Sequence, residues 1–253
     1  MIFEDQLQRK LSISNPPQRI ISLVPSQTEL LVDLGLEERI VGVTKFCVRP
    51  KGLRKSKAIV GGTKNYRMED IASLQPDLII GNKEENEKEG IAELMEKYPV
   101  WMSDILTIED SYKMIQSLGE ILDVRFEADK ILGDIKKELA KPLPIKGKAF
   151  YLIWNEPIMG VGRRTFIDQM LSFAGFENLI QKERYPEISL ENLVRQNPDY
   201  LLLSSEPFPF KQKHVEFFKD ILPDSKVLIV DGEYFSWYGS RLLGAKSYFE
   251  TLI

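Results

Sequence analysis

The sequence predicts an α/β protein of two similar lobes, each a parallel sheet flanked by helices, with a ligand cleft between the lobes. The main observation is a segment that occurs twice, at residues 68–80 and 190–202, with the same order of an apolar residue, Glu, a helix-compatible stretch, Pro-Asp and an apolar run. Glu69 and Glu191 are 122 positions apart, as are the other matched pairs of the two segments. Because solenoid repeats recur about every 20–50 residues, this long spacing indicates two lobes.

Strands and helices alternate along both halves of the chain, which is typical of parallel sheets. Ser26 with Glu29 three residues later predicts a capped helix that ends at Gly35. Thr165 predicts the cap of a matching helix that ends at Gly175. Besides the strand in the second copy of the repeat, the predicted strands cover residues 19–24, 39–43, 77–80, 100–102, 148–154 and 227–230.

One long helix is predicted between the lobes. Thr107 with Asp110 marks its start, apolar residues then recur at helical spacing, and no strong helix breaker occurs before Pro142. We therefore expect an N-terminal lobe over residues 1–106, a linking helix over residues 107–141 and a C-terminal lobe over residues 142–253.

Composition excludes several classes of protein. A net charge of −4 argues against nucleic acid as a partner, and the lack of an 18-residue apolar run argues against a membrane-spanning protein. With one cysteine, Cys47, and one histidine, His214, we expect no metal site and no bound cofactor. We interpret Cys47 as a packing residue and His214 as a surface helix residue. Residues 1–6 lack the features of a signal peptide, which leaves a cytoplasmic location open.

The candidate binding residues follow the predicted strands, because ligands of parallel sheets bind outside the carboxyl ends of the strands. Aromatic and hydrogen-bonding side chains alternate there, which suits a large, partly apolar ligand. The long loop over residues 44–65 and the polar-aromatic loop over residues 231–240 supply many of them. The predicted ligand-binding residues are Lys45, Phe46, Arg49, Lys64, Asn65, Tyr66, Asn82, Trp154, Glu156, Tyr185, Glu206, Glu233, Tyr234, Trp237, Tyr238 and Arg241.

From about residue 18 to its end, the chain resembles the periplasmic binding proteins whose lobes are joined by one long helix. The resemblance rests on residues 19–30, on Val41-Gly42-Val43, on residues 69–80, on the second copy of the repeat and on the last loop. These proteins are the cobalamin, ferric-siderophore and haem receptors of ABC importers, and the likeness is closest to the cobalamin-binding branch. The resemblance implies a non-enzymatic, monomeric, extracytoplasmic receptor that carries a metal-chelate ligand to a permease.

The resemblance also implies roles for particular residues. In the family one acidic residue on each lobe docks onto arginines of the permease, and the matching positions are Glu69 and Glu191. Two carboxylates at matching places suit a two-fold symmetric partner. The pocket differs from the cobalamin pattern, because Thr63-Lys64-Asn65 and Tyr185 stand where the family has Trp, Glu233 where it has Asp, and Trp237 where it has Arg. Cobalamin, ferric siderophores and haem all stay open as ligands.

A second interpretation is a cytosolic corrinoid-binding or metallocofactor-binding protein, or an enzyme, on the same scaffold. Glu156, Glu206 and Glu233 are the residues that acid–base chemistry would use. The sequence contains no nucleophile–base pair, no phosphate-binding glycine loop and no metal motif, so no catalytic residue is assigned.

Overall fold

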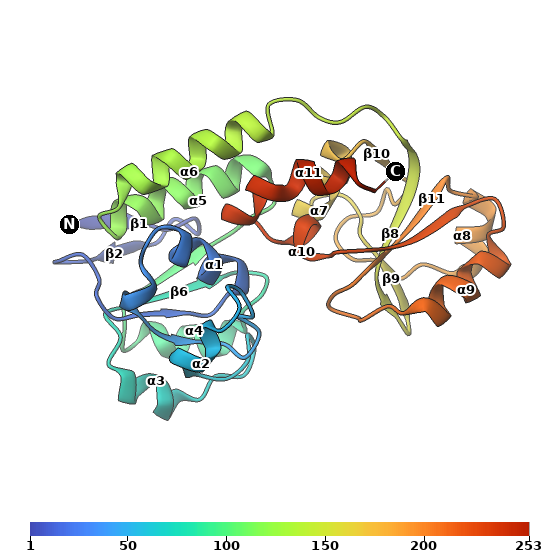
Figure 1. Ribbon diagram of the computed structural model, residues 1–253. Helices are drawn as coiled ribbons and strands as arrows, with labels where there is room; N and C mark the ends of the chain where they lie inside the picture. The colour runs from blue at the N-terminus through green and yellow to red at the C-terminus, as the bar shows by residue number, and fades with distance from the viewer. Residues whose placement is uncertain (253) are drawn as a thin grey trace. The chain divides into compact units, whose positions relative to one another are not determined.

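The first unit is organised around a five-stranded parallel sheet of order β5-β4-β3-β6-β7 (Figure 1). The structure, a computed structural model, describes residues 1–252 and divides into two units. The first unit comprises residues 1–105, 109–135 and 238–241. Its strands are β3 (Ile20–Ser22), β4 (Ile40–Val43), β5 (Ala58–Ile59), β6 (Leu78–Asn82) and β7 (Val100–Ser103), and an antiparallel hairpin of β1 (Ile2–Glu4) and β2 (Lys10–Ser12) precedes them.

Helices cover both faces of this sheet, which accounts for the continuous apolar runs of its strands. On one face, Ile71 of α3 and Ile91 of α4 pack with Ile21, Ile79 and Val100 of the strands. The helices of the first unit are α1 (Pro25–Asp33), η1 (Glu37–Arg39), α2 (Leu53–Ser56), α3 (Met68–Leu74), α4 (Lys88–Met95), α5 (Ile108–Ile121) and α6 (Arg125–Glu138), the last two crossing its boundary at their outer ends.

The second unit, residues 106–108, 136–237 and 242–253, has a sheet of order β10-β8-β11-β12 with β9 antiparallel to β8. Phe150 and Leu203 pack under α8 and α9 against Leu193 and Phe218. Tyr151 points to the opposite face, where its ring lies 5.0 Å from that of Phe235. The strands are β8 (Gly147–Asn155), β9 (Ile158–Gly160), β10 (Phe176–Asn178), β11 (Tyr200–Ser204) and β12 (Lys226–Val230), and the helices are α7 (Phe166–Phe173), α8 (Leu190–Gln196), α9 (Gln212–Ile221), α10 (Glu233–Ser236), η2 (Ser240–Gly244) and α11 (Ala245–Glu250).

The predicted repeat is confirmed, because both copies fold in the same way. The first forms α3, a left-handed residue at Gln75 (φ 46°) and β6; the second forms α8, a left-handed residue at Asn197 (φ 40°) and β11. The strand order β4-β3-β6-β7 of the first sheet has its counterpart in β10-β8-β11-β12 of the second.

The aspartate of the Pro-Asp pair has one role in both units. The Asp77 carboxylate accepts hydrogen bonds from the backbone N–H groups of Gln18 and Arg19 at 2.7 and 2.8 Å, just before β3. The Asp199 carboxylate accepts one from the backbone N–H of Lys148 at 2.7 Å, in β8. Each aspartate therefore joins the strand that it precedes to the start of the neighbouring strand.

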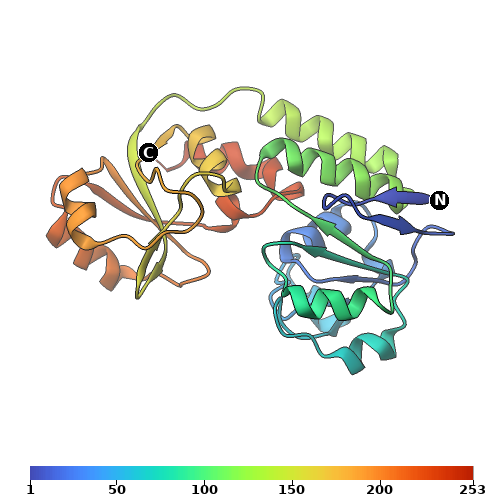
Figure 2. The same cartoon turned by 180° about the vertical axis from the view of Figure 1, so that it is seen from behind.

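The expectation of one long helix over residues 107–141 is wrong in this respect: the segment forms two helices, α5 and α6, which run side by side in both views (Figures 1 and 2). The chain reverses at Asp123, which has the left-handed φ of 56°. A Cβ on Gly119 would lie 2.5 Å from the Cβ of Ala128, so glycine permits the close approach of the two helices at the turn. The predicted lobe boundaries at residues 106 and 142 stay a prediction.

The predicted capping box at Ser26 is also wrong. The helix begins one residue earlier, at Pro25, which is favoured at the first helical position, and no side chain caps it. Glu29 instead pairs with Arg241. The cap at Thr165 is confirmed, because its hydroxyl accepts a hydrogen bond from the N–H of Asp168 at 3.1 Å.

Candidate functional site

The carboxyl end of β4 presents an exposed aromatic ring beside a cation. Phe46 is 49% exposed, and Nζ of Lys45 lies 5.0 Å from the centre of its ring. The side chains of both residues lie against Gly62, where an added Cβ would meet Phe46 at 3.4 Å and Lys45 at 3.6 Å. The structure therefore brings these two predicted residues together, in contact with the end of the long loop.

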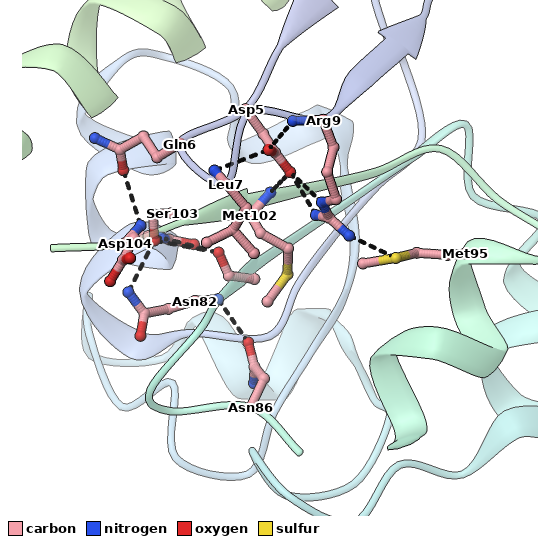
Figure 3. A network of polar contacts seen from close by, with 12 residues as sticks. Asp5, Gln6, Leu7, Arg9, Asn82, Asn86, Met95, Met102, Ser103 and Asp104 are labelled. Carbon is pink, nitrogen blue, oxygen red and sulfur yellow. Dashed lines mark hydrogen bonds and ion pairs between the residues drawn. The ribbon is translucent and has the colours of Figure 1, made fainter. Parts of the chain in front are cut away.

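Asn82 belongs to a buried polar network at the ends of β6 and β7 (Figure 3). Its Nδ2 donates a hydrogen bond to Oγ of Ser103 at 2.9 Å, and its Oδ1 accepts hydrogen bonds from the N–H groups of Glu84 and Glu85 at 2.8 and 3.1 Å. Asn86 accepts a hydrogen bond from the N–H of Asn82 at 2.7 Å. Asn82 thus shapes the turn after β6, and its side chain is already engaged.

The same view shows how the N-terminal hairpin is attached to β7 (Figure 3). The fully buried side chain of Asp5 pairs with the guanidinium of Arg9 and accepts hydrogen bonds from the N–H groups of Leu7, Arg9 and Met102 at 2.9, 3.0 and 3.3 Å. Gln6 accepts a hydrogen bond from the N–H of Asp104 at 3.1 Å. These bonds hold the N-terminal hairpin against β7, so the hairpin belongs to the first unit although it is not part of the parallel sheet.

The end of the long loop is a tight turn with exposed polar residues. Gly61 has φ 122°, and an added Cβ would lie 2.2 Å from the carbonyl oxygen of Asn65. Lys64 and Asn65 are exposed, whereas Tyr66 is half-buried and donates its hydroxyl to the carbonyl of Thr63 at 2.7 Å. Burial raises the pKa of Tyr66 to about 12, which further favours the protonated hydroxyl that donates to Thr63.

Two predicted residues near the C-terminus are anchored inside the first unit. Tyr238 is 4% exposed and donates its hydroxyl to Oε1 of Glu85 at 3.1 Å. Burial and the nearby Glu85 carboxylate raise the pKa of Tyr238 well above its ordinary value. Arg241 forms a two-point ion pair with Glu29, at 3.0 Å from Nε to Oε2 and 2.5 Å from Nη2 to Oε1. Both side chains stabilise the packing of this segment.

In the second unit, Glu206 follows β11 and is hydrogen-bonded to Trp237. Its Oε1 accepts hydrogen bonds from Nε1 of Trp237 at 2.9 Å and from Oγ of Ser236 at 2.8 Å. Burial raises the pKa of Glu206, and the carboxylates of Glu233 and Asp231 act in the same direction against the two hydrogen bonds. Because Trp237 is only 7% exposed, its ring is largely covered in this structure.

Trp154, near the end of β8, is the exposed aromatic residue of the second unit. Its side chain is 39% exposed, and its Nε1 donates to the carbonyl oxygen of Glu156 at 3.0 Å. The ring of Phe208 meets it edge to face at 5.6 Å, and Phe208 in turn packs edge to face on Phe210 and His214. Phe208 was not among the predicted binding residues, although it lies four residues after the end of β11, in the same kind of strand-end loop as the others.

The remaining predicted residues divide between exposed and packed positions. Glu156 is exposed and Arg49 is half-buried. Tyr185 is half-buried, with the guanidinium carbon of Arg184 5.4 Å from its ring centre. Tyr234 stacks on Tyr248 with ring centres 4.5 Å apart, and the neighbouring Glu233 is half-buried at the start of α10.

The two predicted docking residues occupy equivalent places. Glu69 is the second residue of α3 and Glu191 is the second residue of α8, and both are exposed. Within residues 1–252, neither carboxylate has an ion-pair or hydrogen-bond partner. Both are therefore available to an external cation.

Possible metal ligands, membrane-spanning helices and reactive side chains were also sought among the described residues. Across residues 1–252 no group of three or more His, Cys, Asp or Glu side chains could hold a metal ion, and no helix there is long and apolar enough to cross a bilayer. His214 accepts a hydrogen bond from the N–H of Lys211 at Nδ1, at 2.8 Å. Cys47 is buried, which raises the pKa of its thiol and disfavours the nucleophilic thiolate.

Comparison with known proteins places the chain in a protein family. A family model described as periplasmic binding protein matches residues 20–221. An uncharacterized ABC transporter substrate-binding lipoprotein of Bacillus subtilis is 27% identical, covering 79% of this chain and 67% of the relative. A vitamin B12-binding protein of Vibrio parahaemolyticus is also 27% identical, covering 77% of this chain and 74% of the relative.

A solved structure of a similar kind of protein has a similar fold. A possible iron-binding, periplasmic solute-binding protein of Staphylococcus epidermidis superposes with a TM-score of 0.79 at 25% identity, covering 93% of this chain and 98% of that one.

Proposed function

We propose, because this chain belongs to the periplasmic binding protein family, that it is the extracytoplasmic receptor of an ABC importer and binds a large metal chelate of the corrinoid, ferric-siderophore or haem class. It then delivers this ligand to the permease without transforming it. The role as a solute-binding component follows from the family, and the class of ligand is the part that we add.

The observation that carries the ligand class is an exposed aromatic ring at the carboxyl edge of each sheet. Phe46 is 49% exposed after β4, and Trp154 is 39% exposed near the end of β8. The indole N–H of Trp154 is already bonded to Glu156, so the ring offers its apolar surface to a ligand. Apolar ring surfaces bordered by a few polar groups suit a large, partly unsaturated ligand.

Exposed side chains of positive and of negative charge are the other proposed ligand-binding residues. Lys45 and Lys64 in the first unit suit carboxylates or phosphates of a ligand. Glu156 in the second unit suits amide or ammonium groups. The exposed Glu69 and Glu191 are the proposed contacts with arginines of a two-fold symmetric permease.

The test is a tryptophan-fluorescence titration of the purified protein with cyanocobalamin, haemin and a ferric siderophore. The chain has three tryptophans, of which Trp101 is fully buried, Trp237 is 7% exposed and Trp154 is 39% exposed. Saturable quenching by one ligand at micromolar or tighter affinity is expected, and Trp154→Phe should remove more of the signal than Trp101→Phe. If none of the three ligands bound, the proposed ligand class would be wrong.

A further inference from the structure

We propose that α3 and α8 dock on the permease unequally, because α8 adds an exposed apolar strip, Leu190 and Val194, beside Glu191. This inference rests on the proposed function and specifies the surface through which the permease is recognised. A permease with two-fold symmetry offers the same surface twice, so differences between the two docking helices decide how the binding free energy is divided.

The apolar strip lies on the outer surface of α8. Leu190 is 40% exposed and Val194 is 46% exposed, and the two are four positions apart, so they are neighbours on one side of the helix. Leu193 of the same helix is fully buried and anchors α8 on its sheet. The strip is therefore additional to the core contact that holds the helix in place.

The repeat supplies the corresponding positions on α3. At the offset of 122, Leu190 corresponds to Met68 and Val194 to Ala72. Met68 is half-buried and packs against the core of its own unit, and the exposed Ala72 carries only a methyl group. The first helix thus offers much less free apolar surface beside its glutamate.

The polar surroundings of the two glutamates differ in the same direction. Beside Glu69, the guanidinium of Arg67 and the carboxylate of Asp70 form an ion pair. The corresponding residues beside Glu191 are Ser189 and Asn192, where Oγ of Ser189 accepts a hydrogen bond from the N–H of Asn192 at 3.2 Å. At these two flanking positions the residues beside Glu69 are charged and those beside Glu191 are neutral. The one cation of α8, Arg195, donates a hydrogen bond to Oδ1 of Asn192 at 3.1 Å.

Charge and apolar area together point to the permease as the occupant. An exposed carboxylate without a partner in its own chain suits an arginine bordered by apolar side chains. Exposed ion pairs contribute only about 0–1 kcal/mol, so the apolar strip supplies the larger part of the attraction at α8. A lipid surface is a poorer match, because over residues 187–196 the two exposed carboxylates, Glu187 and Glu191, outnumber the one cation, Arg195, and repel anionic headgroups.

The experiment measures binding of the intact protein to the ABC permease that supports uptake in the native host, purified in lipid nanodiscs, by biolayer interferometry without added ligand. Leu190→Ser/Val194→Ser is compared with its repeat-matched control, Met68→Ser/Ala72→Ser. We expect the first pair to weaken binding at least tenfold and the control pair less than about threefold, where tenfold corresponds to about 1.4 kcal/mol.

Further variants separate this inference from the proposed function. Val194→Thr, which keeps the shape of the side chain, should weaken binding without affecting folding, and circular dichroism with the fluorescence titration checks the fold of every variant. Loss of binding in Glu69→Ala/Glu191→Ala with no effect of the apolar pair would overturn this inference alone. A wild-type protein that did not bind the permease would overturn both. A concentration-dependent dimer that Leu190→Ser/Val194→Ser abolishes, seen by sedimentation velocity, would assign the strip to a second copy of this chain and overturn the inference.

Discussion

The indole N–H of Trp237 donates a hydrogen bond to Oε1 of Glu206 at 2.9 Å, and the hydroxyl of Ser236 donates to the same oxygen at 2.8 Å. Two donors on one oxygen favour the ionised carboxylate, but burial and two neighbouring carboxylates outweigh them, so the pKa of Glu206 is raised. The last loop of the second unit is therefore held by an acid that binds its proton more tightly in the folded state.

Glu206→Gln should make the free energy of unfolding less dependent on pH. Because the pKa of Glu206 is raised above its ordinary value of 4.5, its contribution to stability is complete below about pH 4.5 and is lost as the pH rises through the folded-state pKa. Glutamine keeps a carbonyl acceptor for Trp237 and carries no charge. The stability of the variant relative to the wild type should therefore rise with pH, as measured by urea unfolding between pH 4.5 and pH 8.

The exposed Glu156 lies at the same edge of the sheet, and Glu156→Gln controls for the change of a carboxylate to an amide. A stability difference between Glu206→Gln and the wild type that stays constant with pH would show that burial does not control this carboxyl.

Gly35→Ala and Gly175→Ala should destabilise the protein by different amounts, although both glycines end corresponding helices. Gly35 has φ 79° and no atom within 4 Å of an added Cβ, so only the left-handed backbone costs about 1–2 kcal/mol. Gly175 has φ 88°, and its Cβ would lie 2.2 Å from the carbonyl oxygen of Pro144. Chemical denaturation should give a loss of more than about 3 kcal/mol for Gly175→Ala; equal losses would contradict the clash.

The ion pair of Arg241 and Glu29 should contribute to the stability of the first unit. The two side chains are only 12% and 15% exposed, so removing one partner leaves the other charge poorly solvated. Arg241→Met should cost about 3 kcal/mol of unfolding free energy. The double variant Arg241→Met/Glu29→Gln should lose less than the sum of the single variants, and strict additivity in this double-mutant cycle would count against the interaction.

Trp154→Ala should weaken ligand binding by more than about 1 kcal/mol, because its exposed ring is the proposed contact with the ligand. Trp237 is the other predicted ring contact, and Trp237→Ala is expected to weaken binding by more than about 1 kcal/mol as well. Isothermal titration calorimetry with the ligand found by fluorescence measures both affinities. A variant whose affinity for the ligand is unchanged would show that the replaced tryptophan does not contact the ligand.

The sequence was most informative where local chemistry alone decides the structure. Pro76-Asp77 and Pro198-Asp199 marked the same helix-to-strand turn twice, and the Thr165 cap depends on a residue only three positions away. The turn at Asp123 was missed because an aspartate with positive φ has no distinctive local pattern within a helical one. Pro25 displaced the expected cap at Ser26 because a proline is itself favoured as the first helical residue.

The sequence predicted where the candidate residues lie, at the ends of strands, but not which of their side chains are exposed and which are bonded within the fold. The expectation that ligands bind at the carboxyl ends of parallel strands pointed to Lys45, Phe46 and Trp154, and all three are exposed. Tyr238 and Arg241 form their contacts with residues 153 and 212 positions away. No local pattern reveals such partners, so residues that hold the fold together were indistinguishable from residues free to meet a ligand.

The placement of residues 238–241 within the first unit bears on how the protein is made. These four residues are synthesised after nearly all of the second unit, yet Tyr238 and Gly239 bond to Glu85 and to Ser111 at 3.1 and 3.0 Å. A growing first unit therefore lacks the hydrogen bonds to Glu85 and Ser111 until residues 238–241 have left the ribosome. The first unit therefore completes its own packing only after most of the second unit has been synthesised.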